Sequence, residues 1–273
     1  RSLANNIEMH VATAMNSVRA AVAMRETLLN YQRQFGQSAL ELAQSDRRGG
    51  FIFTSKDRTR LARFVDLLRR HDISVHQLAE DHGVGETVYA SNESYIGPLA
   101  QHQYRMIRTI FDSQTEFAKP IFYDVSGWTL PLAYNLDYTE LPNNRTVRNL
   151  VGAPAEPEFP KPTAPDVGNY GYVLDWTDYR APRALYRVLE AGLIARSAQV
   201  PISVSTQTGD IKLERGAVFI PMGGQPLSGE AIHQLMAEIA REDGVAIHAL
   251  DSGRTAQAGA DFGSGGSFST LKM

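Results

Sequence analysis

The feature that most constrains the fold is an approximate internal repeat. The stretch DVSGWT at 124–129 returns as LDSGRT at 250–255, and YIGPLAQ, which contains Pro98, returns as VFIPMGGQ, which contains Pro221. The two Ser-Gly pairs lie 126 positions apart and the two prolines 123 positions apart, so the register holds to within a few residues. We therefore predict two similar units that arose by internal duplication.

Strand and helix patterns alternate in both units. Leu61, Phe64, Val65 and Leu68 fall at i, i+3, i+4 and i+7, the spacing of an amphipathic helix. Such alternation predicts parallel sheets covered on both faces, arranged either as a pair of small α/β layers or as one larger doubly wound sheet. The expected fold class is α/β, three-layer αβα, with two similar Rossmann-like or flavodoxin-like units. Strands are expected at 51–55, 73–78, 86–99 (two short strands), 121–125, 171–176, 201–205, 209–222 (a hairpin-like pair) and 245–251, and helices at 56–72, 102–111, 179–198 and 230–243.

The remaining segments set the expected domain boundaries. Helical spacing of Ile7, Val11 and Val18 predicts an N-terminal helical segment. Six of the thirteen prolines lie between 142 and 165, which is typical of an extended connector. The chain begins with an arginine and not a methionine, so we expect a piece of a longer protein. The predicted division is a helical segment at 1–48, a first α/β unit at 49–139, a Pro-rich connector at 140–169 and a second α/β unit at 170–273.

Composition excludes several classes of function. The net charge of −3 gives no overall attraction to nucleic acid or to anionic membranes, and no apolar run is long enough to span a bilayer. Cysteine is absent, which excludes disulfides, thiolate metal sites and a cysteine nucleophile. We therefore expect no nucleic-acid partner and no membrane span.

The twin Ser-Gly-x-Thr motifs are the first candidate binding residues. Each follows an expected strand, and ligands in open α/β sheets bind beyond the carboxyl ends of the strands. Hydroxyls and exposed amides can hold an anion, an indole can stack on a ring, and a guanidinium can pair with a carboxylate or phosphate. The alternative is a strand-to-loop turn whose hydroxyls satisfy local amides. The candidate side chains are Ser126, Trp128, Thr129, Ser252, Arg254 and Thr255.

A polar cluster, DWTDYRAPR at 175–183, is the second candidate. It follows a strand and opens a helix, which places it at the ligand side of the predicted sheet. The alternative is a helix N-cap by Thr177 or Asp178 with solvated arginines. The glycine-bearing exit MGGQ at 222–225 has a similar position and adds an amide side chain. From these two stretches the candidate ligand-binding residues are Asp175, Trp176, Asp178, Arg180 and Gln225.

Catalytic and metal-binding patterns are weak in this sequence. His71, His76 and His82 do not have the spacing of a zinc motif, and no His-x-x-Glu pair occurs. Neither serine motif is Gly-x-Ser-x-Gly. His248 and Asp251 precede Ser252, but neighbours along a strand point to alternate faces and do not form a triad by sequence proximity. No catalytic residue, cofactor or metal is therefore expected in this chain.

Several long phrases resemble a known family. IFYDVSGWTLPLAYNL, YGYVLDWTDYRAPRALYRVLEAGL, SYIGPLAQHQYRMIRTIF and DFGSGGSFSTLK are similar to the region that follows the catalytic domain in large bacterial zinc carboxypeptidase-like proteins of the M14 family. The resemblance covers the chain from about Leu28 onward. It implies a class I glutamine amidotransferase-like α/β architecture, but those enzymes use a cysteine and this chain has none. It also implies that the zinc and its His-x-x-Glu ligands belong to an upstream domain.

Three functions follow as hypotheses. The first is a non-catalytic accessory domain of a zinc metallocarboxypeptidase, with the upstream peptidase domain as its partner. The second is a module that binds a small molecule, glycan or peptide at the strand ends. The third, for which the sequence offers no convergent set of residues, is a hydrolase with a serine or carboxylate site. The resemblance favours a periplasmic or extracellular location.

Overall fold

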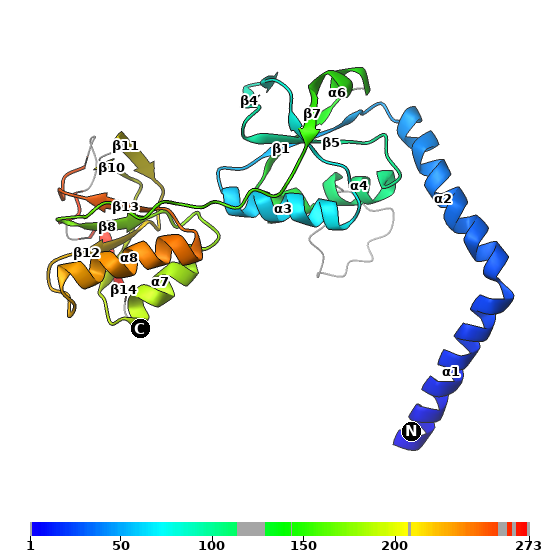
Figure 1. Ribbon diagram of the computed structural model, residues 1–273, viewed down its shortest axis with the longest axis horizontal. Helices are drawn as coiled ribbons and strands as arrows, with labels where there is room; N and C mark the ends of the chain where they lie inside the picture. The colour runs from blue at the N-terminus through cyan, green and yellow to red at the C-terminus, as the bar shows by residue number, and fades with distance from the viewer. Residues whose placement is uncertain are drawn as a thin grey trace. The chain divides into compact units, whose positions relative to one another are not determined.

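The structure is a computed structural model that describes residues 2–113, 129–142, 144–206, 209–255, 261–263 and 266–271. Two compact units divide the chain: the first comprises Arg1–Thr54 and Leu67–Ala155, and the second comprises Ser55–Asp66 and Glu156–Met273. Figure 1 shows the elements with their labels. Of the helices in the described part of the chain, none combines the length and apolar character that crossing a membrane requires.

The first repeat forms a five-stranded sheet in the order β6-β1-β5-β2-β7. Every strand pairing recorded in this sheet is antiparallel. A small hairpin, β3 with β4, interrupts the chain between β2 and β5. The elements are β1 (Gly50–Thr54), α3 (Arg58–Arg70), β2 (His76–Leu78), β3 (His82–Val84), β4 (Thr87–Tyr89), β5 (Ser94–Pro98), α4 (Tyr104–Phe111), α5 (Leu130–Ala133), β6 (Asp137–Leu141), α6 (Asn144–Leu150) and β7 (Val151–Pro154).

The second repeat forms a five-stranded sheet in the order β13-β8-β12-β9-β14, again with antiparallel pairings. A hairpin, β10 with β11, interrupts the chain between β9 and β12. The elements are β8 (Gly171–Leu174), α7 (Ala181–Glu190), β9 (Ala195–Ala198), β10 (Ile202–Thr206), β11 (Gly209–Leu213), β12 (Val218–Pro221), α8 (Gly229–Asp243), β13 (Ile247–Leu250) and β14 (Phe268–Leu271).

The predicted similarity of the two units is confirmed by these two strand orders. If strands are numbered within each repeat and the inserted hairpins are set aside, both sheets have the order 4-1-3-2-5. The first four strands and two helices follow the β-α-β-β-α-β pattern of the ferredoxin-like split βαβ fold. Each repeat is therefore a ferredoxin-like unit with an inserted hairpin and a fifth edge strand.

The coarse prediction of a mixed α/β fold is confirmed, but the prediction of parallel sheets is wrong. Strands β1 and β2 do run in the same direction, as a strand-helix-strand connection favours. However, β5 lies between them and runs the opposite way, so its pairings with both neighbours are antiparallel. Strand β12 does the same between β8 and β9. Periodicity along the chain cannot reveal which strand is inserted between two others.

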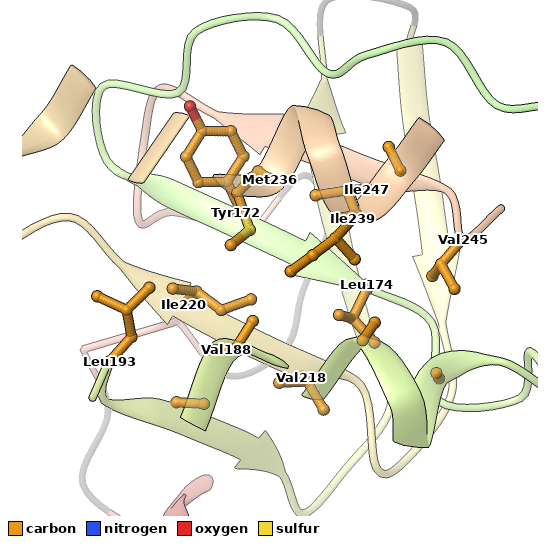
Figure 2. Packing of buried hydrophobic residues seen from close by; sticks show 14 of the residues in the cluster. Tyr172, Leu174, Val188, Leu193, Val218, Ile220, Met236, Ile239, Val245 and Ile247 are labelled. Carbon is orange, nitrogen blue, oxygen red and sulfur yellow. The ribbon is translucent and has the colours of Figure 1, made fainter. Parts of the chain in front are cut away.

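Among the described residues of the second repeat, helices cover one face of the sheet, which differs from the expected three layers. The side chains of Tyr172 and Leu174 pack with Val188 of α7 and with Met236 and Ile239 of α8 (Figure 2). The opposite face is covered by apolar residues of the β10–β11 hairpin and by the aromatic ring of Phe262. This arrangement gives one helical layer, one sheet and a partial β-layer.

Three local boundaries also differ from the predictions. The expected helix at 179–198 ends at Glu190, and its last part forms β9. The expected hairpin at 209–222 is not formed, because β11 pairs with β10 while β12 enters the main sheet. The segment at 140–154 contributes β6, α6 and β7 to the first repeat, so irregular backbone extends only from Ala155 to Gly168.

Equivalent turns recur after the first helix of each repeat. After α3, the Asp72 N–H donates to Arg69 O and the Ile73 N–H donates to Leu68 O. After α7, the Gly192 N–H donates to Leu189 O in the same pattern. The middle residue of each turn has positive φ, 54° at Asp72 and 76° at Gly192. Glycine adopts this conformation without strain, whereas aspartate has a steric cost.

The N-terminal segment is helical, as predicted, with a break at Met24 between α1 (Leu3–Ala23) and α2 (Arg25–Ser45). No residue of α1 is buried. Helix α2 contributes two buried alanines, Ala39 and Ala43. The part of the segment that joins the first unit's core is therefore the second half of α2.

A charged cluster follows the end of α2. The Asp46 carboxylate accepts hydrogen bonds from the Arg48 backbone and guanidinium, from the Tyr104 hydroxyl at 2.8 Å and from Arg108 at 2.8 Å. Burial alone would raise the pKa of Asp46, but these hydrogen bonds outweigh burial and hold the pKa well below its usual range. The cluster therefore favours an ionised Asp46 and fixes the end of α2 against α4.

Candidate ligand-binding site

A cavity of about 530 Å³ lies in the second compact unit, beside the carboxyl end of β8. Its walls come from the segment at 56–58, from the loop between β8 and α7, from β11, from β13 and from the Pro-rich segment that precedes β8. Both acidic and basic side chains line it. The charged and polar lining residues are Lys56, Asp57, Arg58, Lys161, Asp175, Thr177, Asp178, Lys212 and His248.

The acidic wall consists of Asp175 and Asp178. One Asp175 carboxylate oxygen accepts the Thr177 N–H at 2.9 Å, and one Asp178 oxygen accepts the Arg180 N–H at 2.8 Å. Burial raises the pKa of Asp178, and the charges of Asp57 and Asp175 raise it further. The loop backbone thus fixes both carboxylates, and their mutual repulsion favours a positive charge nearby.

His248 lies on β13, opposite Val173 of β8. Burial lowers the pKa of His248, and the nearby Asp175 carboxylate offsets part of this effect. A histidine with a lowered pKa is neutral at neutral pH. His248 therefore adds hydrogen-bonding atoms to the cavity but does not neutralise Asp175.

The basic wall includes Lys161 of the Pro-rich segment and Lys212 of β11. Both residues are exposed. Within the described part of the chain, neither ammonium group has an ion pair with a carboxylate. The cavity thus presents these two lysines, which have no such ion pair, together with the carboxylates of Asp175 and Asp178.

The first repeat provides an internal comparison for the positions of Asp175 and His248. Gly50 pairs with Pro98 in the first sheet as Gly171 pairs with Pro221 in the second, which aligns Thr54 with Asp175. By the same register, Thr139 opposite Ile52 corresponds to His248 opposite Val173. The fold is thus built with two threonines in one copy and with an aspartate and a histidine in the other. Asp175 and His248 are not required by the fold.

Two of the predicted residues near the cavity serve other contacts. The Arg180 guanidinium donates to the Asp243 carbonyl at the end of α8, at 3.1 Å, and lies 5.7 Å from the Phe159 ring centroid. The Trp176 ring packs against Gly216, where an added Cβ would lie 3.0 Å from the indole. Neither residue lines the cavity. Of the cluster at 175–183, the structure brings only the two aspartates and Thr177 to the cavity.

Gln225 forms a bridge between two loops of its own repeat. Its side-chain oxygen accepts the Ile194 N–H at 2.8 Å, and its Nε2 donates to the carbonyls of Ile194 and Pro221 at 2.9 and 2.7 Å. Gln101 makes the same three contacts in the first repeat, with the backbone of Ser74 and with Pro98 O. We call this arrangement the glutamine bridge. Its recurrence indicates a structural role for Gln225.

The second Ser-Gly-x-Thr motif forms a hydrogen-bonded turn. The Ser252 hydroxyl accepts the Arg254 N–H at 3.2 Å, and the Thr255 N–H donates to the Asp261 carboxylate at 2.9 Å. An added Cβ at Gly253 would lie 2.4 Å from the Tyr170 ring, so the motif needs glycine for close packing. These contacts agree with the turn alternative for this copy.

The first motif is only partly covered by the structure. Thr129 donates from its hydroxyl to the Asp112 carbonyl at 3.2 Å. Ser126 and Trp128 lie outside the described residues, as does the expected strand at 121–125.

Sequence reasoning did not select the lysines or His248 for a site. Lys161, Lys212 and His248 lie on three separate segments, and no motif links them. Among the residues that the structure describes, no group of three or more His, Asp or Glu side chains has a geometry that could hold a metal ion. The only signal for His248 was its place on a strand near the second Ser-Gly-x-Thr.

Comparisons with known proteins found no matching family model, no similar curated protein and no similar solved structure.

Proposed function

We propose that this chain is a non-catalytic accessory region of a zinc carboxypeptidase-like protein, and that it packs against a peptidase domain upstream. The family resemblance of the phrases quoted above suggests the partner. The zinc and its ligands would belong to the upstream domain, because the sequence has no His-x-x-Glu pair. The same resemblance leads us to propose a periplasmic or extracellular location.

The observation that carries this proposal is the apolar face of α1. Ile7, Val11, Val18 and Val22 recur at helical spacing, and their exposed fractions are 54, 57, 61 and 67%. Only two formal charges, Glu8 and Arg19, lie in the 21 residues of this helix. A contiguous exposed apolar stripe of this kind marks an interaction surface, and most helical stability in proteins comes from packing of such a stripe.

The first test compares two proteins. The native gene product, identified in the source cells with an antibody against this chain, is purified beside the 273-residue chain. We expect the native product to be much larger than 30.1 kDa and to release C-terminal residues from peptides in a zinc-dependent manner. The chain alone should be inactive with added zinc. A native product near 30 kDa, or hydrolysis by the chain alone, would overturn the proposal.

The second test addresses the α1 face. In the native product, Val11→Glu with Val18→Glu should loosen packing on the peptidase domain and make the junction more sensitive to limited proteolysis. Thr13→Glu with Asn16→Glu is the matched control, because both positions are exposed and lie off the apolar stripe. Equal protection of the two variants would contradict a docking role for the stripe.

A second candidate function, binding of a small molecule, glycan or peptide, is favoured by the cavity of the second unit.

A further inference from the structure

We propose that the cavity beside β8 binds a zwitterion, specifically a short peptide with free ends. Its ammonium group would lie against Asp175 and Asp178, and its carboxylate would lie against Lys161 and Lys212. This inference concerns the second unit by itself and does not depend on an upstream peptidase domain.

The size and charge of the cavity support this class of ligand. A volume of about 530 Å³ falls within the range of small-ligand sites, roughly 300–1000 Å³, and is much larger than a single small ion needs. The lining includes three carboxylates, of Asp57, Asp175 and Asp178, and four basic side chains, of Lys56, Arg58, Lys161 and Lys212. A simple anion would meet the repulsion of the carboxylates, and a simple cation would meet that of the basic groups. A ligand that carries both charges at opposite ends avoids both penalties.

The acidic wall is prepared for a cation. Each aspartate uses one oxygen to accept a hydrogen bond from the loop backbone, at 2.9 Å for Asp175 and 2.8 Å for Asp178. These contacts fix the carboxylates before a ligand arrives, which lowers the entropic cost of binding. His248 lines the same cavity, and burial lowers its pKa, so it does not balance the charge of Asp175. An incoming ammonium group would place a positive charge beside these carboxylates.

The rest of the lining is mixed. The charged segment Lys56–Arg58 contributes to it, and Ile211 and Leu213 of β11, Ala246 before β13 and Pro162 of the Pro-rich segment form an apolar part. Aliphatic and proline side chains of this kind favour an aliphatic ligand side chain. We therefore choose dileucine as the probe, with N-acetyl-dileucine and dileucine amide as its two neutralised forms.

The duplication identifies a variant that preserves the fold. Thr54 stands at the position of Asp175 in the first repeat, so the strand end does not require a carboxylate. Asp175→Asn keeps the oxygen that accepts the Thr177 N–H and removes the charge. Lys161→Gln with Lys212→Gln removes two basic charges from exposed positions. Glu190→Gln, at the end of α7 and outside the cavity lining, is the control for loss of a charge.

The experiment is titration calorimetry of the three ligands against the complete chain and these variants. We expect dileucine to bind at least about tenfold more tightly than either neutralised form, because each form leaves one charged wall unpaired. Asp175→Asn should abolish the preference for dileucine over N-acetyl-dileucine but keep the preference over dileucine amide. The double lysine variant should abolish the preference over dileucine amide but keep the preference over N-acetyl-dileucine. Glu190→Gln should retain both preferences.

Three results would overturn the inference: equal binding of all three ligands, no binding of dileucine at millimolar concentration, or tighter binding of inorganic phosphate than of dileucine. Thermal unfolding of each variant shows that the fold is retained. Because the titration contains no peptidase domain, a failure to bind dileucine would leave the accessory proposal unaffected. A failure of the accessory proposal would likewise leave the peptide-binding inference unaffected.

Discussion

Removal of the glutamine bridge tests whether each repeat is stabilised internally by the same set of contacts. Gln225→Ala deletes one acceptor and two donor contacts to the backbone of Ile194 and Pro221, at 2.7 to 2.9 Å. Gln101→Ala deletes the equivalent contacts to Ser74 and Pro98. We expect both substitutions to destabilise their own repeat by a similar amount.

The magnitude follows from the number and exposure of these bonds. A typical intramolecular hydrogen bond contributes about 1 kcal/mol net, so three bonds set an upper value of about 3 kcal/mol. Two of the three bonds at each bridge are solvent-exposed, and water can replace them in the variant. We therefore expect each alanine substitution to lower the free energy of unfolding by about 2 kcal/mol.

Urea denaturation measures this loss of stability. Because two units need not unfold together, amide hydrogen exchange at Ser74 and Ile194 assigns the loss to one repeat. Gln199→Ala is the control, since Gln199 makes a single side-chain bond, to Ser197 O at 3.3 Å. It should cost about 0.5 kcal/mol or less. Unchanged stability in Gln225→Ala together with weakened ligand binding would refute the structural role and restore Gln225 as a binding residue.

Three further substitutions test local features of the two repeats. Asp72→Gly should raise the free energy of unfolding by about 0.5 kcal/mol, because it relieves the positive φ of 54° at Asp72. Gly192→Ala, at the equivalent position with φ 76°, should lower the free energy of unfolding by about 1 kcal/mol; denaturant titration of both variants checks the two signs. Asp46→Asn should cost about 1–3 kcal/mol at pH 7, because it weakens charge-assisted hydrogen bonds from Arg48 and Arg108, although both guanidinium groups keep their ion pairs with Asp112. Since the folded-state pKa of Asp46 is lowered, the contribution of Asp46 to stability is present above the unfolded pKa of about 4 and is lost as the pH falls below that value. The difference in free energy of unfolding between wild type and Asp46→Asn should therefore shrink in urea titrations at decreasing pH. A stability difference that is constant with pH would contradict the ionised cluster.

The repeat was predictable because its signals are local. Pro98 and Pro221 end equivalent strands, and the helices at 102–111 and 230–243 follow from apolar spacing alone. Strand direction was not predictable in this way. It depends on β5 and β12 lying between two earlier strands, and that is a property of pairing between distant segments.

The cavity was predictable only in part, for a similar reason. Asp175 and Asp178 follow a strand and open a helix, so position in the chain was enough to select them. Lys161, Lys212 and His248 reach the same cavity from three other segments, and only the folded chain brings them together. Conversely, Gln225 had the right location for a ligand but is engaged with backbone atoms, which no sequence pattern reveals.

The two repeats together separate what the fold needs from what it does not need. An aspartate recurs just before the first helix of each repeat: Asp57 accepts the N–H of Arg60, three residues on, at 2.9 Å, and Asp178 accepts the N–H of Arg180, two residues on, at 2.8 Å. The two contacts differ in span, but each satisfies a backbone N–H near the helix start, which explains an aspartate at this position in both copies. Asp175 has no such counterpart, since Thr54 replaces it without any change in strand order. Of Asp175 and Asp178, Asp175 is therefore the one whose substitution should separate ligand binding from stability.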